Sequence, residues 1–211
     1  MAQTTIPQSI ADICSYLSAS KWSLSRPTQD GRINAAINED EVIRQIAQAF
    51  EIDVPRSRAW YDFAIEENGV FYPVNIKVTD TTHTDNLNCK LGIYYALTGL
   101  KPSFQNEIGW LSYFEKLKQN FGHDKSRDYY FLIVNKRDLS DIFCATLKGL
   151  QQLQPNGNNL PFQSCWDRNR VVQNRTFEQA AQLILGKLGA SIKLRSEIYF
   201  NFKKFFPEYV L

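Results

Sequence analysis

The sequence predicts an α/β fold, with a central mixed β-sheet flanked by helices, in a single domain that covers residues 1–211. Strand-like segments at 62–65 and 70–78 flank the sequence Glu67-Asn68-Gly69, a tight turn typical of a β-hairpin. Residues 129–134 form an apolar run of aromatic and β-branched side chains, as expected of a central strand buried on both faces. A chain of 211 residues that is 44% hydrophobic can bury one substantial core and needs no second domain.

Two helices are expected before the hairpin. In residues 6–17 the apolar positions recur at helical spacing. A second helix is expected to start at Asn38 and to run to Phe50, because Glu41 stands three residues after Asn38 in the pattern of a capping box.

After the hairpin, helices and extended segments follow one another. We expect a polar loop at 79–88, helices at 87–97 and 107–121, a loop at 151–159 and an extended segment at 160–166. Gly99 should end the first of these helices, whereas residues 138–150 fit a strand or a helix equally well. Thr176 and Gln179 form a capping box, and the chain from 192 onward is also expected to be helical. The buried side of the helix that follows Thr176 should comprise Phe177, Ala180, Ala181, Ile184, Leu185 and Leu188.

The composition narrows the classes of function. The 24 basic and 22 acidic residues leave a net charge of only +2, so any contact with nucleic acid must come from a local basic surface. The four cysteines form no CxxC pair and there are only two histidines, so we expect no structural zinc site and reduced cysteines. Neither a signal peptide nor a membrane-spanning segment is evident, which indicates a soluble protein of the cytoplasm.

The hairpin carries the residues best suited to chemistry. Asp62 on its first strand faces Asn75-Ile76-Lys77 on the second, where Asn75 and Lys77 share one face and Ile76 points to the core. Hydrolysis of a phosphodiester near neutral pH needs oxygen ligands for a metal ion, and Mg²⁺ usually takes one or two carboxylates. Lys77 is suited to stabilise the negative charge that develops on a phosphate. The alternative is that all three are ordinary solvent-facing residues of an amphipathic hairpin.

This arrangement resembles the PD-(D/E)XK nuclease superfamily and, within it, the type II restriction endonucleases of the blunt-cutting branch. The resemblance rests on Tyr61-Asp62, on Asn75-Ile76-Lys77 and on Val78-Thr79 after it, and it covers about residues 30 to 100. It implies a restriction-endonuclease-like fold and Mg²⁺-dependent, site-specific hydrolysis of double-stranded DNA by a homodimer that reads a short palindromic site. In that family pattern Asp62 and position 75 bind the metal, Lys77 is catalytic, and a helix glutamate, here assigned to Glu41, lies near the site.

Asn75 departs from the family pattern, which has a carboxylate at this position. An asparagine offers only a neutral carbonyl oxygen, so the change weakens both metal binding and the electrostatic support for Lys77. Three explanations remain open: the residue was changed to trap an uncleaved DNA complex, another carboxylate compensates, or the protein binds DNA without cutting it. Glu41 is the first candidate for compensation, although it also fits the capping role, and Asp80 and Glu66 follow. The alternative functions are therefore a non-cleaving DNA-binding protein of the same fold and a DNA-repair nuclease.

Contacts to DNA are expected from loops that flank the cleft. The candidates are Thr79, Thr81, Thr82, His83, Asn86 and Asn88 in one segment, and Arg168 and Arg170 (with Arg175) in another. Ordinary exposed turns and a solvated charged surface would have the same composition. His83 is also a conceivable metal ligand or base, although a lone histidine in a loop is more often neither.

The C-terminal segment interleaves aromatic residues with lysines. Its aromatic residues are Phe200, Phe202, Phe205, Phe206 and Tyr209. They are suited to pack a helix onto the core or onto a second subunit, or to stack on the bases of a single strand. A protein that reads a palindrome is expected to be a two-fold dimer, for which the N-terminal helices are a plausible interface.

Overall fold

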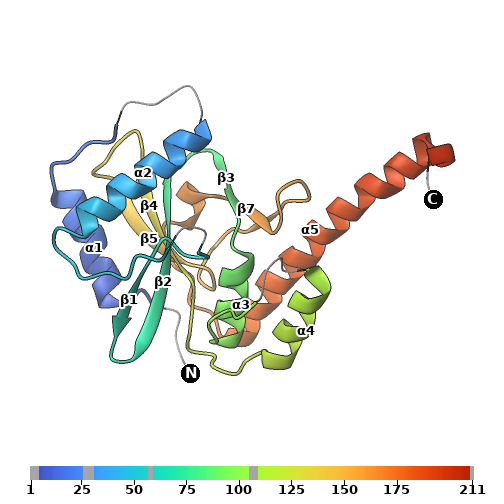
Figure 1. Ribbon diagram of the computed structural model, residues 1–211, viewed down its shortest axis with the longest axis horizontal. Helices are drawn as coiled ribbons and strands as arrows, with labels where there is room; N and C mark the ends of the chain where they lie inside the picture. Colours follow the sequence, from blue (N-terminus) through green and yellow to red (C-terminus); the bar gives the residue numbers. More distant parts are fainter. Residues whose placement is uncertain (1–4, 26–30, 57–58, 105–108, 210–211) are drawn as a thin grey trace.

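The computed structural model of the chain describes residues 5–25, 31–56, 59–104 and 109–209, with the side chains of 31–36 excepted. The fold is mixed α/β: a four-stranded mixed sheet lies between two layers of helices, and a second sheet of three strands lies beside it (Figure 1). The expected α/β class, with a mixed sheet flanked by helices, is thereby confirmed.

The elements occur along the chain in an order that alternates helices with strands. They are α1 (Gln8–Ala19), α2 (Gly31–Ile46), β1 (Phe63–Glu67), β2 (Val70–Thr79), β3 (Thr84–Leu87), α3 (Lys90–Thr98), α4 (Trp110–Asn120), β4 (Tyr130–Asn135), β5 (Ile142–Thr146), β6 (Gln154–Pro155), β7 (Phe162–Cys165), the short 3₁₀ helix η1 (Trp166–Asn169), α5 (Phe177–Phe205) and the 3₁₀ helix η2 (Pro207–Tyr209).

The larger sheet has the strand order β1-β2-β4-β5. The predicted hairpin is confirmed: β1 and β2 are antiparallel, and the turn between them places Asn68 and Gly69 at positive φ (53° and 71°), as a two-residue turn of this kind requires. β4 pairs in parallel with β2 and antiparallel with β5, so it is an inner strand. The run at 129–134 was therefore correctly read as a central strand, and the ambiguous region 138–150 contains the strand β5.

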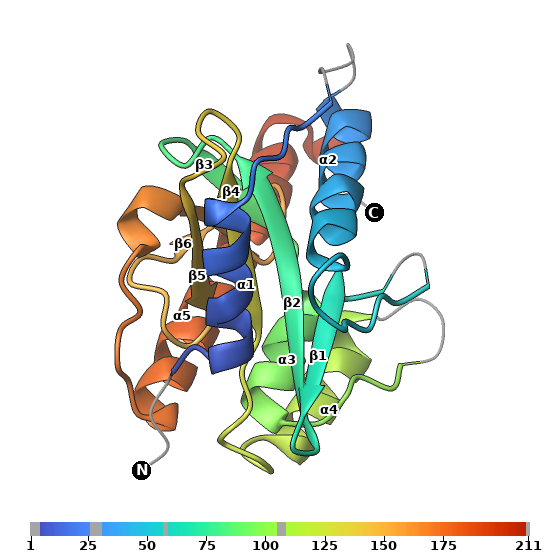
Figure 2. The same cartoon turned by 90° about the vertical axis from the view of Figure 1, so that its left-hand side faces the viewer.

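Side chains alternate along β2 and β4 between two hydrophobic layers. Val74, Ile76 and Leu132 pack with α1 and α2 on one face of the sheet. Phe131 and Ile133 pack with α3, α4 and α5 on the other face. Figure 2 shows α1 and α2 running along the first face, with α3 and α4 beyond the sheet. The expectation that Ile76 points into the core is confirmed.

The second sheet has the order β3-β7-β6 and forms beside the carboxyl end of β2. Residues 79–88 were expected to be a loop, which is wrong for Thr84–Leu87, because these residues pair antiparallel with Phe162–Cys165. The extended segment at 160–166 is confirmed by β7. The supposed loop at 151–159 contains the two-residue strand β6, and Asn156 within it is buried.

The helices agree with the predictions except at some of their ends. α3 ends at Gly99, whose φ of 74° is the left-handed conformation predicted for a helix stop. α2 begins at Gly31 rather than Asn38, so Asn38 is an interior helical residue and its predicted capping role is wrong. Part of the predicted start of the helix at 107–121 falls on 105–108, outside the described residues, and α4 begins at Trp110.

The helix after Thr176 has the predicted capping box, with Thr176 and Gln179 bonded reciprocally. It continues without a break to Phe205, so the expected C-terminal helix is part of α5. Five of its six predicted core residues are buried, whereas Leu185 is exposed.

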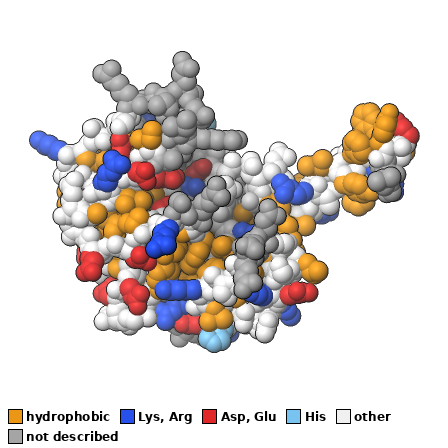
Figure 3. Space-filling view, in the orientation of Figure 1, with side chains coloured by type: hydrophobic (Ala, Val, Ile, Leu, Met, Phe, Trp, Pro, Cys, Tyr) orange, Lys and Arg blue, Asp and Glu red, His pale blue; other side chains and the backbone are white. Residues whose placement is uncertain are grey.

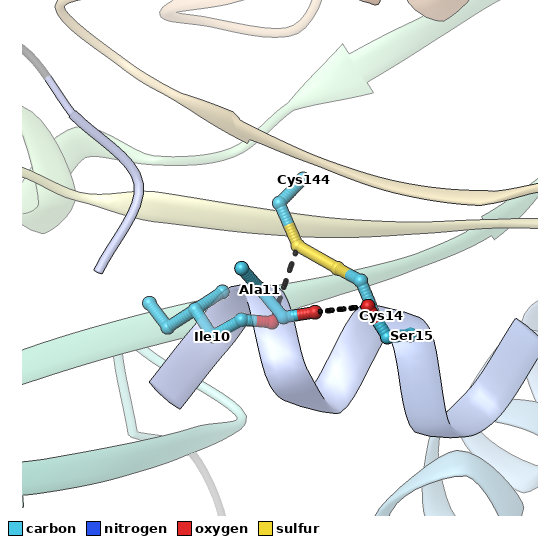
Figure 4. The surroundings of a disulfide bond; sticks show 5 residues. All are labelled: Ile10, Ala11, Cys14, Ser15 and Cys144. Atoms are coloured by element: carbon cyan, nitrogen blue, oxygen red, sulfur yellow. Dashed lines mark hydrogen bonds between the residues drawn. A yellow bond between two sulfur atoms is a disulfide. The ribbon is translucent and has the colours of Figure 1, made fainter. Parts of the chain in front are cut away.

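A disulfide joins the first helix to the sheet. Cys14 of α1 is bonded to Cys144 of β5, across 130 residues of sequence (Figure 4). Cys89 and Cys165 are free thiols. The expectation that all four cysteines are reduced is therefore wrong for this pair, because the packing of α1 on β5 brings together two residues far apart in sequence. Among the described residues, no helix has the length and apolar character that crossing a bilayer requires.

Candidate functional site

Asp62 lies directly before β1, at the edge of the larger sheet. The register of the hairpin pairs Phe63 with Val74, which places Asp62 opposite Asn75. The N–H of Asp62 donates to the carbonyl oxygen of Val74 (2.9 Å), and the N–H of Ile76 donates to Oδ2 of Asp62 (2.6 Å). Asp62 precedes the first residue of β1, and its carboxylate accepts the hydrogen bond that the next residue of β2 donates. The carboxylate thus holds the two segments together.

Asn75 is bound to the same carboxylate oxygen. Its Nδ2 donates to Oδ2 of Asp62 over 2.7 Å. Because the amide nitrogen faces Asp62, the carbonyl oxygen Oδ1 of Asn75 is the atom left to accept a hydrogen bond or bind a cation. Oδ1 of Asp62 takes part in neither of these two bonds, so the pair presents two oxygen atoms from two different side chains.

Lys77 lies two residues further along β2, on the same face as Asn75. The parallel register pairs Asn75 with Phe131 and Lys77 with Ile133 of β4, so both polar side chains emerge at the edge of the hydrophobic layer formed with α3. Nζ of Lys77 lies 3.4 Å from the carbonyl oxygen of Asn86 on β3, a long hydrogen bond. The structure therefore brings Asp62, Asn75 and Lys77 together, as the sequence predicted.

Glu39 is a carboxylate whose pKa responds to the charges of this site and which the sequence analysis missed. It lies on α2, which contacts β2, and its half-buried carboxyl group has a pKa raised to about 7. Burial is the largest cause, and the charge of Asp62 is the next, while Lys77 acts in the opposite direction. A signal was available in the sequence, since Glu39 precedes the buried residues Val42 and Ile46 by three and seven positions and so shares their face of the helix.

Glu41, the glutamate expected near the metal, has a different partner. Its carboxylate accepts hydrogen bonds from the backbone N–H (2.9 Å) and from the hydroxyl of Ser25, and these bonds lower its pKa. Asp62 is not among the charges that act on it. The helix carboxylate that shares the field of Asp62 and Lys77 is thus Glu39, two residues earlier, and the assignment to Glu41 is corrected accordingly.

Burial is the main cause of the raised pKa values of Asp62 and Glu39. The pKa of Asp62 is raised by burial, although the N–H of Ile76 and the charge of Lys77 partly oppose this. The pKa of Glu39 is raised as well, and Asp85 of β3, which accepts a hydrogen bond from Nε1 of Trp166 (3.0 Å), adds to its negative surroundings. A bound cation would oppose this effect by favouring the ionised form of both carboxyl groups.

The oxygen atoms of Asp62 and Asn75 are of the kind that Mg²⁺ prefers, since this ion is commonly bound through one or two carboxylates with water completing its shell. Glu39 is a further carboxyl group whose pKa responds to the charge of Asp62. Across the described part of the chain, no three His, Cys, Asp or Glu side chains converge into a metal cluster. An ion at this position would therefore depend on the neutral oxygen of Asn75 as well as on the two carboxylates.

The other carboxylates considered as substitutes lie outside this group. Asp80 forms an ion pair with Arg137 and accepts hydrogen bonds from Thr82, and these interactions hold its pKa at about 2. Glu66 is an exposed residue of β1. Of the carboxylates proposed to compensate for Asn75, none is placed as Glu39 is.

The predicted DNA-contacting residues at 79–88 divide into exposed and engaged side chains. Thr82, Asn86 and Asn88 are exposed and Thr79 is half-buried, although Asn86 also accepts a hydrogen bond from Asn156 (2.8 Å). Thr81 is only 2% exposed, which does not fit a contact to DNA. The remaining residue, His83, is exposed, and its Nδ1 lies 3.1 Å from Oδ2 of Asp80.

The predicted basic cluster does not form a single surface. Arg168 is exposed, but Arg170 donates two hydrogen bonds to Asp141 (2.7 and 2.8 Å) and also binds Asp167. These partners raise the pKa of its guanidinium. Arg175 donates to the carbonyl oxygens of Lys148 and Leu150 and supports the fold there. Arg170 and Arg175 are thus engaged with other parts of the fold, whereas Arg168 is an exposed side chain.

Comparison of the chain with models of known protein families found no match, and comparison with curated proteins found none either.

Proposed function

We propose that this chain is a Mg²⁺-dependent endonuclease that hydrolyses phosphodiester bonds of double-stranded DNA at a short palindromic site, in the manner of a type II restriction endonuclease of the cytoplasm. The observation that carries the proposal is the cluster at the end of the hairpin: Asp62 bonded to Asn75 and to the backbone of Ile76, with Lys77 on the same face. The bonds also join β2 to the segment before β1, and Lys77 on the same face is the feature that distinguishes the cluster from a structural bond alone.

The residues of the cluster have separate roles in this proposal. Asp62, Glu39 and Oδ1 of Asn75 would hold the metal ion, which when bound supplies an activated water and charge neutralisation at the phosphate. Lys77 is the one cation among these residues, and its ammonium group would donate to the non-bridging oxygens of the scissile phosphate as their charge increases. Ile76 fixes the carboxylate of Asp62 through its backbone N–H, so that the oxygen atoms are positioned before the ion binds.

Glu39 supports compensation as the explanation for Asn75. The family pattern places a carboxylate at position 75, and the asparagine removes one negative charge from the metal site. Glu39 supplies a second carboxylate in the field of Asp62 and Lys77, so the number of negative groups available to a divalent ion is two. Two carboxylates lie within the range commonly used for Mg²⁺ in nucleases and related enzymes.

A non-cleaving DNA-binding protein is the second candidate, and two observations favour it. Oδ2 of Asp62 already accepts two hydrogen bonds, and Glu39, with a pKa of about 7, is only partly ionised near neutral pH. Both features reduce the negative charge that would attract a divalent ion. A DNA-repair nuclease shares the same centre and differs in having no sequence preference.

Sequencing of cleaved ends separates these functions. The chain is incubated with a pool of random duplex DNA and Mg²⁺, and in parallel with Mn²⁺, and the new 5′ ends are sequenced. Ends that share one short palindrome are the expected result. Ends without a common sequence would support the repair nuclease, and retention of DNA without any new ends would support the non-cleaving protein. A chain that neither cuts nor retains DNA at low salt would remove all three.

A further inference from the structure

The last part of α5 extends away from the body of the molecule (Figure 1). We call residues 192–209 the C-terminal arm. Arg195 is the last described residue of the helix that hydrogen-bonds to the body, through the carbonyl oxygens of Gly157 (2.9 Å) and Asn158 (2.7 Å). From Lys193 to Tyr209 every residue is exposed.

The arm continues the apolar stripe by which α5 packs on the core. In the first half of the helix, Ala180, Ile184 and Leu188 are buried at a spacing of four residues. The same face continues with Leu194, Ile198 and Phe202, again four residues apart, and then Phe205. Ile198 is 55% exposed and Phe205 is 70% exposed, so the stripe goes on where the body no longer covers it.

The arm exposes more apolar surface than an isolated helix should. Its exposed large hydrophobic residues are Leu194, Ile198, Tyr199, Phe200, Phe202, Phe205, Phe206 and Tyr209. Figure 3 shows these hydrophobic side chains gathered on the protruding end of the molecule. Contiguous apolar patches of this kind mark an interaction surface, and a helix of this length draws most of its stability from packing.

The chain also has an apolar groove that its own arm cannot reach. Phe114, Leu117, Phe121 and Leu185 line a hollow of about 180 Å³ between α4 and α5, with Lys118 at its side. It adjoins a second hollow of about 470 Å³ that includes Phe177 and the polar residues Lys125, Glu178 and Gln182. α5 is a single helix from Phe177 to Phe205, so its end lies about 30 Å from Leu185 along the helix axis. The arm of the same chain therefore cannot fold back into this groove, whereas the arm of a second molecule can enter it.

We propose that the arm is a dimerisation element, and that in a two-fold homodimer each arm lies in the α4–α5 groove of the other copy. Each arm has eight large side chains that are roughly half exposed, which on aromatic-sized areas offers roughly 800 Å² a copy. The face that meets the groove would bury part of this area and the partner's groove a similar area, so that the two reciprocal contacts together can reach the ~1,200–2,000 Å² of a standard stable interface. A reciprocal exchange closes with two copies, because each contributes one arm and one groove.

The dimer would give the proposed nuclease two centres, and this part of the inference rests on the proposed function. A palindromic site presents one scissile bond on each strand, so each centre of a two-fold dimer would meet one bond. The N-terminal helices were the expected interface, but in the described part of the chain Ile37 of α2 is their one large exposed hydrophobic residue. Dimerisation by the arm requires neither DNA nor metal, so it can be measured while the nuclease function is untested.

Analytical ultracentrifugation of the full chain, without DNA or metal, tests the proposal. The arm variant carries both Phe202→Glu and Phe205→Glu, and the groove variant carries Leu185→Glu. Leu111→Glu, at an exposed hydrophobic residue of α4 outside the groove, is the matched control. All four positions are exposed, so the fold should survive, which circular dichroism checks. We expect a dimer for the wild type and the control and monomers for both the arm and groove variants.

Mixing the two monomeric variants sharpens the result. One intact arm and one intact groove remain in such a mixture, so a fraction of heterodimer should reappear that neither variant forms alone. A monomeric wild type at tens of micromolar would overturn the proposal. A dimer that persists in the arm variant would also overturn the proposal. A dimer that persists in the groove variant would show that the arm does not lie in the groove of the other copy. Loss of DNA retention in an arm variant of a monomeric wild type would assign the arm to nucleic acid instead.

Discussion

Nδ2 of Asn75 donates a 2.7 Å hydrogen bond to Oδ2 of Asp62, the oxygen that also accepts from the N–H of Ile76. An asparagine at this position therefore does more than occupy a place where the resembling nucleases have a carboxylate. Its amide nitrogen contacts Asp62 without adding a second negative charge, and its carbonyl oxygen is oriented away from that contact. The site can therefore remain folded without a cation. The cost is one negative charge fewer for a metal ion.

Replacing Asn75 by aspartate should make the fold dependent on a divalent ion. Two carboxylate oxygens would then lie at hydrogen-bond distance with no proton between them, which disfavours the ionised pair. In EDTA at pH 8 we expect Asn75→Asp to lower the free energy of unfolding by about 1–3 kcal/mol. Mg²⁺ should raise the melting temperature of this variant more than that of the wild type.

Asn75→Ala is the control for this change, because it removes the hydrogen bond without adding charge. Its loss of stability should be smaller and should not respond to Mg²⁺. Equal melting temperatures of Asn75→Asp and the wild type in EDTA, with no response to Mg²⁺, would contradict the proposed proximity of position 75 to a metal site.

Glu39 should make the stability of the metal-free protein depend on pH. Its pKa rises from 4.5 to about 7 in the folded chain, so the folded state binds the proton more tightly than the unfolded state. The stabilising contribution is complete below pH 4.5 and is lost as the pH rises to about 7. Glu39→Gln imitates the protonated form, so urea unfolding between pH 5 and 8 should show a smaller decline in stability than the wild type.

Glu41→Gln is the matched control on the same helix. The pKa of Glu41 is lowered by its bonds to Ser25, so its contribution is present above pH 4.5 and is lost only in more acid solution. This variant should be less stable than the wild type at neutral pH and should keep the wild-type decline between pH 5 and 8. An unchanged decline in Glu39→Gln would remove Glu39 from the site.

Arg168 and Arg170 should respond differently to alanine substitution. Arg168 is exposed, so Arg168→Ala should weaken DNA binding and reduce the slope of log K against log salt by about 1. Arg170 is bonded to Asp141 and Asp167, so Arg170→Ala should chiefly lower the melting temperature. Binding isotherms at several salt concentrations, together with thermal unfolding, measure both effects. If instead Arg170→Ala weakened DNA binding and Arg168→Ala did not, the DNA would lie over Arg170.

The Cys14–Cys144 disulfide should stabilise the fold without taking part in the chemistry. It closes a loop of 130 residues, and cross-links of this kind contribute about 2–4 kcal/mol. Reduction, or Cys144→Ser, should lower the denaturant midpoint by a corresponding amount and leave DNA binding intact in dilute buffer. Mass spectrometry of the unreduced protein checks that the bond is formed, and an equal midpoint with and without reductant would argue against it.

The sequence was sufficient to predict the elements whose signals are local. The Glu67-Asn68-Gly69 turn, the stop at Gly99 and the capping box at Thr176 depend on a few neighbouring residues, and all three occur in the structure. The pairing of Asp62 with Asn75 was predictable for the same reason, because a two-residue turn fixes the register of a hairpin.

Features that depend on contacts between segments far apart in the sequence could not be predicted from local patterns. β3 is a strand only because Thr84–Leu87 pairs with β7, some eighty residues later, and its own sequence is that of a polar loop. The disulfide needs the packing of α1 on β5. Glu39 was missed because the start of α2 was placed at Asn38, so that the capping pattern around Glu41 outweighed the helical spacing to Val42 and Ile46.

A single-turnover cleavage measurement tests the central claim most directly, that Asp62, Asn75 and Lys77 form a nuclease centre. The wild type, Lys77→Ala, Asn75→Asp and the surface control Lys21→Ala are compared on duplex DNA in Mg²⁺ and in Mn²⁺, with binding measured in Ca²⁺. We expect the wild type and the control to cut at equal rates and Lys77→Ala to bind DNA but to cut roughly 100-fold more slowly or worse. If the wild type and Asn75→Asp both leave every duplex intact in either metal, the hairpin is no nuclease centre.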